Sequence, residues 1–190
     1  AESLSANDPF VVRGRIAVLA ATDRVDDLVC FTEDRLEGEH SAIEDLANAG
    51  LAHLLAGRPR KALELYERAG VRLQRWIADA LVWSWRFPHS LYFAAALLAH
   101  GERRRGLEIL GEAERLYDRL EAEGLVNPDL SYQRAVVLAL RGEEEASRLM
   151  LARAEQEGWR ARWWTDRDPV LAGVAAGTGP ALDRAPPTNA

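Results

Sequence analysis

The sequence predicts an all-α protein, an α-solenoid of stacked antiparallel helix pairs with about eight helices and a short closing helix. Apolar residues recur at helical spacing along most of the chain, and no stretch alternates long enough to indicate a strand. Capping residues mark the helix starts, and single glycines separate many of the helices. Small and bulky residues also recur at fixed distances from three of those glycines, which indicates a repeated unit.

Helix starts are easy to recognise in this chain because acceptor side chains precede prolines. Such a side chain accepts a hydrogen bond from a backbone N–H of the first turn, and proline has no N–H to leave unpaired there. Three dipeptides of this kind occur, Asp8-Pro9, Asn127-Pro128 and Asp168-Pro169. Ser41 and Glu44 have the spacing of a capping box. We therefore expect helices over residues 9–21, 24–37, 42–56, 59–74, 88–100, 103–122, 128–141, 143–157 and 169–175.

Three glycines between helices, Gly57, Gly101 and Gly142, set the register of a repeat and lie 44 and 41 residues apart. Side-chain size is kept at four positions around each of them. The small positions are Gly50, Ala94 and Ala135 (seven residues before), Ala62, Gly106 and Ser147 (five after), and Ala69, Ala113 and Ala154 (twelve after); the bulky ones are Tyr66, Leu110 and Leu151 (nine after). Because small residues let two helix backbones approach closely and bulky ones fill the remaining space, the pattern predicts three similar helix pairs.

This register resembles the tetratricopeptide repeat, a helix–turn–helix unit of about 34 residues with small, glycine and large positions in the same order. The units would cover residues 43–76, 87–120 and 128–161, with a more divergent helix pair at 9–37. They depart from the family by lacking its helix-ending proline and by longer links between units. The resemblance implies one helical domain over residues 1–176, and the Pro-rich tail over 177–190 is expected to be disordered.

The stretch GWRARWWTDRDPVLAG, residues 158–173, looks like the end of tetratricopeptide arrays attached to bacterial winged-helix transcriptional regulators and to class III adenylate cyclases. There, a Gly-Trp-Arg, an aromatic pair and an Asp-Pro-x-Leu turn close the last repeat. The resemblance implies a closing segment over residues 158–175 and a chain that is the interaction or sensory part of a bacterial signalling protein.

Composition and charge exclude several classes of function. The net charge of −6 and pI of about 5.3 argue against nucleic-acid binding, which needs concentrated Lys and Arg, and against binding to a membrane surface. No uninterrupted run approaches the ~18 apolar residues of a membrane span, and the lone Cys30 excludes an internal disulfide. The first residues, AESLSANDPF, lack the features of a signal peptide, which favours a cytoplasmic location; a periplasmic one stays open because the chain begins with Ala.

The sequence carries no recognisable catalytic or metal-binding motif. Its four histidines, His40, His53, His89 and His100, have neither metal-ligand spacing nor an HExxH arrangement. No nucleophile elbow, phosphate-binding glycine loop or paired cysteine motif occurs. We therefore expect a protein that is not an enzyme and that binds no cofactor or metal.

All six tryptophans fall outside the expected regular helix pairs, at Trp76, Trp83, Trp85, Trp159, Trp163 and Trp164. Two interpretations stay open. Tryptophans can cover the ends of a solenoid and fill the gaps at long links, which is the favoured interpretation for Trp163 and Trp164. They can also form a binding surface, since Trp and Arg dominate the energetics of interfaces, and for Trp83 and Trp85 both interpretations remain.

The tetratricopeptide resemblance implies an apolar concave groove that holds a protein or peptide partner, including a helical one. Its expected partner-binding residues are Leu51, Leu54, Leu55, Leu91, Leu98, Tyr132, Val136 and Leu140. Trp83 and Trp85 are added to them as candidate binding residues of the Trp-rich insertion. A second copy of the chain is an alternative occupant, and we expect the chain to cover part of the groove itself because so large an apolar lining is unfavourable in water. A different class of function also stays open: a small-molecule sensor or enzyme whose apolar ligand cavity is closed by the Trp-rich insertion, residues 76–87.

Overall fold

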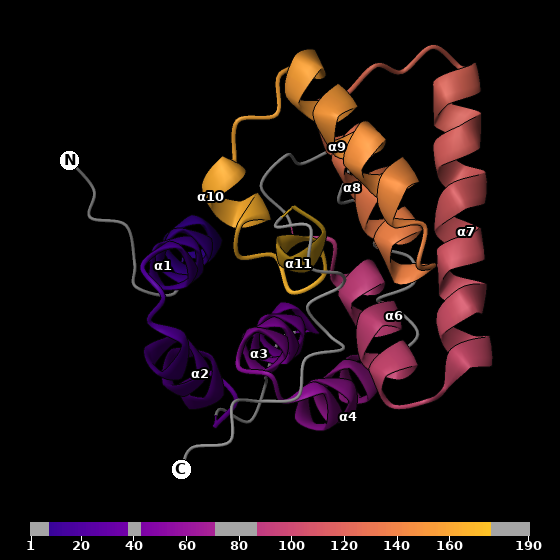
Figure 1. The fold of residues 1–190 in the computed structure, drawn as a ribbon. Helices are drawn as coiled ribbons and strands as arrows, with labels where there is room; N and C mark the ends of the chain where they lie inside the picture. The colour runs from indigo at the N-terminus through magenta and orange to yellow at the C-terminus, as the bar shows by residue number, and fades with distance from the viewer. Residues whose placement is uncertain (1–7, 38–42, 71–86, 176–190) are drawn as a thin grey trace.

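The computed structural model describes residues 8–37, 43–70 and 87–175. Within these ranges every regular element is an α-helix, which confirms the all-α class (Figure 1). The helices are α1 (Pro9–Ala21), α2 (Val25–Asp34), α3 (Ile43–Leu55), α4 (Pro59–Ala69), α6 (His89–Ala99), α7 (Arg103–Ala122), α8 (Pro128–Leu140), α9 (Glu144–Glu157), α10 (Arg162–Thr165) and α11 (Leu171–Ala175).

Apart from the closing segment, the expected helix starts lie within one residue of those in the structure. The side chain of Asp8 accepts a hydrogen bond from the N–H of Phe10 at 2.8 Å, and that of Asn127 accepts one from the N–H of Asp129 at 2.8 Å. The main difference lies in the closing segment, where the short helix α10 was not expected and α11 begins at Leu171 rather than 169. The helix expected over 59–74 is shorter than expected, because α4 ends at Ala69 and Gly70, with a φ of +74°, breaks the helix. Ser41 and the tail over 177–190 lie outside the described residues.

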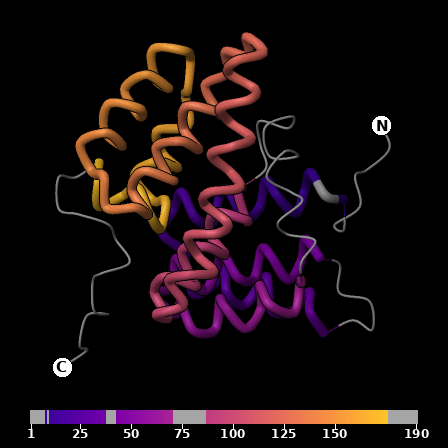
Figure 2. Tube along the Cα trace, turned by 90° about the vertical axis from the view of Figure 1, so that its right-hand side faces the viewer, coloured from indigo at the N-terminus to yellow at the C-terminus, as the bar shows by residue number. Residues whose placement is uncertain are grey.

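Three helix hairpins form the main body of the described structure. They are α3–α4, α6–α7 and α8–α9, and successive hairpins meet where α4 contacts α6 and α7 contacts α8. The turns inside the three hairpins contain Gly57, Gly101 and Gly142, whose φ angles of +67°, +85° and +82° favour glycine. Helix α7 runs from the level of α3 and α4 up to the α8–α9 hairpin (Figure 2).

The repeated pattern of side-chain sizes coincides with the contacts inside these hairpins. All twelve of its positions are buried. A Cβ atom added to Gly50 would lie 2.8 Å from the Tyr66 ring, and the Ser147 hydroxyl donates a hydrogen bond to the Ala135 carbonyl at 2.7 Å. The small residues are therefore needed where α3 approaches α4 and α8 approaches α9.

The remaining helices, α1 and α2 at the start of the chain and α10 and α11 at the end of the described part, pack against the hairpins. Helix α1 packs on α2, and α2 packs on α3. At the other end of the chain, α10 contacts α1, and α11 contacts α8 and α9, so that α11 lies near the centre of the view in Figure 1. Both ends of the described chain thus meet on one side of the hairpins.

Candidate functional site

Most of the expected groove residues lie inside the structure. Leu51, Leu54, Leu91, Tyr132 and Val136 are buried, and Leu55, Leu98 and Leu140 are half-buried. The tryptophans Trp83 and Trp85, like Trp76, lie outside the described residues. Contacts of α2 with α3 and of α11 with α8 contribute to this burial. A partner would reach the five buried side chains only if covering elements moved, so their role in binding stays a prediction.

Asp168 anchors the closing segment to the hairpins. Its fully buried carboxylate accepts hydrogen bonds from the hydroxyls of Tyr92, at 2.6 Å, and Tyr132. It also accepts from the backbone N–H groups of Val170 and Leu171 at 2.8 and 3.0 Å, as expected for a capping residue before a proline. Burial raises the pKa of Asp168, and the hydrogen bonds from both tyrosines oppose that rise. The start of α11 is thereby tied to α6 and α8.

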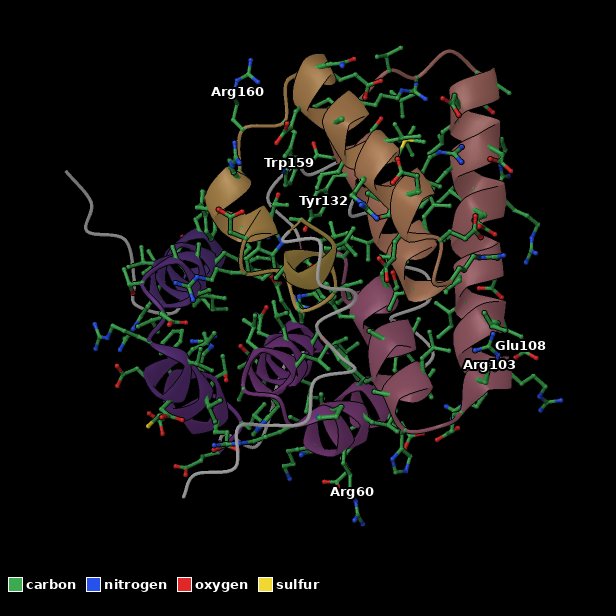
Figure 3. All side chains as sticks on the ribbon, viewed as in Figure 1. Arg60, Arg103, Glu108, Tyr132, Trp159 and Arg160 are labelled. Atoms are coloured by element: carbon green, nitrogen blue, oxygen red, sulfur yellow. The ribbon has the colours of Figure 1, made fainter. Side chains whose placement is uncertain are left out.

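Aromatic contacts hold the closing segment in place beside this anchor. The Trp159 ring stacks on Tyr132 with a centroid distance of 4.2 Å and an interplanar angle of 15° (Figure 3). The indole N–H of Trp159 donates to the Thr165 hydroxyl at 3.1 Å, which fixes the ring. Trp164, only 3% exposed, contacts Phe87 with the ring centroids 4.6 Å apart. This buried position agrees with the interpretation of Trp164 as a covering residue.

A cavity of about 390 Å³ lies between α1, the start of α6, α8 and the closing segment. Its aromatic lining residues are Phe10, Phe87, Tyr132, Trp159, Trp163 and Trp164. Two of these, Phe10 and Trp163, are 53% and 42% exposed, whereas the others are buried or half-buried. The cavity therefore has deep aromatic walls together with two aromatic side chains that reach solvent.

Two of the polar side chains in the lining already have partners. Arg13 lies 3.5 Å from the carboxylate of Glu44, and its guanidinium sits over the Phe10 ring at 5.1 Å. The amide oxygen of Gln133 accepts a hydrogen bond from the Tyr117 hydroxyl at 2.9 Å. The positive charge of Arg13 and the amide oxygen of Gln133 therefore already have partners within the protein.

The third polar side chain, Asp129, differs from both. It is only 9% exposed, it lines the cavity, and among the described residues its carboxylate takes part in no ion pair. Burial raises its pKa from 3.8 to about 6, and the hydrogen bond from its own backbone N–H only partly offsets this. A carboxyl with a perturbed pKa in a cavity is a candidate functional group.

Sequence reasoning identified part of this cavity. Tyr132 is one of the expected binding residues, and the tryptophans of the closing segment stand out in the sequence, but Phe10 and Phe87 carry no signal of a site. The repeat register places Asp129 on the same concave side as Tyr132, three residues before it, but does not single it out as a binding residue.

Other kinds of site find no support in the described part of the chain. No group of three or more His, Cys, Asp or Glu side chains within those residues could hold a metal ion. None of the helices in the described ranges has the length and apolar character required to cross a membrane.

Comparisons of the chain with models of protein families, with curated proteins and with solved structures found no match. The tetratricopeptide resemblance therefore rests on the residue register and stays a prediction.

Proposed function

We propose that this chain is an α-solenoid of tetratricopeptide-like hairpins and acts as a non-catalytic recognition module that binds a ligand in its aromatic cavity. The buried, size-matched positions of the three hairpins and the contacts between successive hairpins support the solenoid. The resemblance of residues 158–173 supports a place in a bacterial signalling protein.

The observation that carries the proposal is the cavity itself. Its volume of about 390 Å³ falls in the range of about 300 to 1,000 Å³ that small-molecule pockets occupy. Its lining is mostly apolar, with six aromatic side chains and a few polar groups, which is the usual composition of a ligand site. Of the two classes of function left open by the sequence, ligand binding is the one that this geometry favours.

The position of the cavity suits a sensor. Its walls come from α1, from Phe87 before α6, from α8 and from the closing segment, which are far apart in the sequence. A ligand that contacts all of these walls stabilises the arrangement in which they meet, by an amount set by its concentration and affinity. Ligand binding would then change how firmly α1 and the closing segment are held.

A protein or peptide partner is the second candidate function, and the exposure of Phe10 and Trp163 favours it. Both are large aromatic side chains that line the cavity and reach solvent. Aromatic residues of this kind are enriched in binding hot spots. Such a partner, or a second copy of the chain, would cover the entrance rather than fill the expected groove.

Native mass spectrometry of the purified chain tests ligand binding, with Ala17→Trp as the matched variant. Ala17 lines the cavity on α1, so the larger side chain should occupy ligand space. We expect a bound small molecule on the wild-type protein and none on the variant. Ala21→Trp, at the exposed end of the same helix, is the control and should retain the ligand.

Absence of a ligand in the same experiments has a definite meaning. The proposed function would be contradicted if the wild-type protein carried no small molecule and if every compound of a metabolite panel stabilised the wild type no more than the Ala17→Trp variant.

A further inference from the structure

We propose that the cavity takes a small organic cation, an alkylated ammonium compound, held between the Asp129 carboxylate and the faces of the surrounding aromatic rings. The inference rests on the proposed ligand-binding function and names the chemical class of the ligand.

The charges of the lining favour a cation. Arg13 is the positively charged side chain of the lining, and Glu44 lies 3.5 Å from it. The Asp129 carboxylate has no ion-pair partner among the described residues, although only 9% of the residue is exposed. A buried charge without a partner is unfavourable, and a ligand of opposite charge relieves that cost.

The aromatic rings favour the same charge. The faces of Trp, and less strongly of Tyr and Phe, attract cations within about 6 Å of the ring centroid. Trp159 is held by its stacking on Tyr132 and by its hydrogen bond to Thr165, so its orientation is fixed before a ligand arrives. Trp163 adds a further indole ring to the lining.

The shortage of hydrogen-bond acceptors distinguishes between kinds of cation. The amide oxygen of Gln133 already accepts from Tyr117, and the hydroxyl of Tyr132 is directed to Asp168. A guanidinium or a primary ammonium would leave several N–H donors without acceptors in a largely apolar cavity. An alkylated ammonium has few such donors or none, and its methyl groups suit aromatic walls.

An inorganic cation fits this lining poorly. Divalent ions such as Ca²⁺ and Mg²⁺ need about six oxygen ligands, or keep several waters. Asp129 is the one carboxylate of the described lining, and no cluster of metal-ligating side chains surrounds it in the described part of the chain.

Isothermal titration of the full chain with choline and with 3,3-dimethyl-1-butanol tests the inference. The second compound replaces the charged trimethylammonium group by a neutral group of nearly the same shape. We expect choline to bind at least about tenfold more tightly than the neutral compound. Tetraethylammonium serves as a second cation of different shape and should also bind.

Two variants locate the charge that is responsible. Asp129→Asn should remove the preference for choline over the neutral compound, because it removes the uncompensated carboxylate. Glu145→Gln is the matched control: it removes one negative charge from the first turn of α9, away from the cavity lining, and should leave the preference unchanged.

Failure of this inference is distinguishable from failure of the proposed function. If choline and the neutral compound bind with equal affinity, the cation inference is wrong. Loss of the binding of both compounds in the Ala17→Trp variant would show that the cavity is nevertheless the ligand site. Choline binding that is unchanged by Asp129→Asn would also overturn the cation inference. No binding of choline or tetraethylammonium up to about 10 mM, beyond the millimolar range of weak ligands, would overturn it as well.

Discussion

Asp129 and Asp168 are buried carboxyl groups with opposite surroundings. Asp168 accepts four hydrogen bonds, two from tyrosine hydroxyls and two from backbone N–H groups. Asp129 faces the cavity without an ion-pair partner among the described residues. Burial raises the pKa of both, but only Asp168 has a set of donors that opposes the rise. The first arrangement stabilises the structure, and the second leaves a charge available to a ligand.

Removal of the Asp168 carboxylate should strongly destabilise the protein. Asp168→Ala leaves two buried tyrosine hydroxyls without their acceptor, so we expect the free energy of unfolding to fall by roughly 3 kcal/mol or more. Tyr92→Phe removes one hydrogen bond and should cost about 1 kcal/mol. Urea unfolding measures both. Asp166→Ala, at an exposed neighbouring position, is the control, and an equal loss there would contradict the role of Asp168.

Asp129 should make the stability of the protein depend on pH. Its pKa is about 6 in the folded state against 3.8 when solvated, so the folded state binds more protons and becomes less stable as pH rises from about 4 through 6. At pH 7.5, Asp129→Asn should therefore raise the free energy of unfolding by up to about 3 kcal/mol, less the small loss of a favourable charge at a helix start.

Denaturant unfolding at several pH values checks this prediction. The difference between Asp129→Asn and the wild type should shrink as the pH falls and vanish below about pH 3, where the carboxyl is protonated in both the folded and the unfolded state. A variant less stable than the wild type at pH 7.5 would show that the ionised carboxylate is stabilised by a partner.

At the level of the elements, local patterns explain why so much of the fold could be predicted. Helix starts depend on a few neighbouring residues, as at Asp8 and Asn127, and glycine turns depend on one φ angle, as at Gly57. Helix α10 was missed because its four residues carry no periodic pattern and are held by distant contacts such as Trp164 with Phe87. The full lining of the cavity could not be predicted, because its walls come from α1, α8 and the closing segment, which only the tertiary contacts bring together.

The register of the repeat can be tested inside one helix. Ala113 is fully buried on α7, so Ala113→Leu should overfill the contact and lower the free energy of unfolding by roughly 1–3 kcal/mol. Ala122→Leu, at the exposed end of α7, makes the same change without a packed neighbour and should have little effect. An unfolding midpoint that is the same for Ala113→Leu and the wild type would argue against the register.

At the scale of the whole molecule, the two ends of the described chain meet. Helix α1 contacts α10, and Arg167 of the closing segment forms an ion pair with Asp23 after α1. The anchor at Asp168 ties the same segment to α6 and α8. The closing segment therefore both covers apolar side chains of the hairpins and forms one wall of the cavity.

This closure predicts that the expected groove is covered by the chain itself. Leu54 is 4% exposed and Leu98 packs against Gly106, so Leu54→Arg and Leu98→Arg should each lower the melting temperature markedly. Leu149→Arg, on the exposed face of α9, is the control because Leu149 is 66% exposed. Normal melting of Leu54→Arg and Leu98→Arg, measured by circular dichroism, would instead indicate an open groove.

The ¹³C chemical shift of the Asp129 carboxyl carbon, followed by NMR as a function of pH, measures the pKa of the group that we propose to bind the cation. The charged side chain that shares its lining, Arg13, is neutralised by Glu44, so burial controls the titration. Our account predicts a pKa near 6 in the free protein and a lower one with saturating choline, because a bound cation favours the ionised carboxylate. A pKa near the ordinary 3.8 in the free protein, or one that choline leaves unchanged, would contradict it.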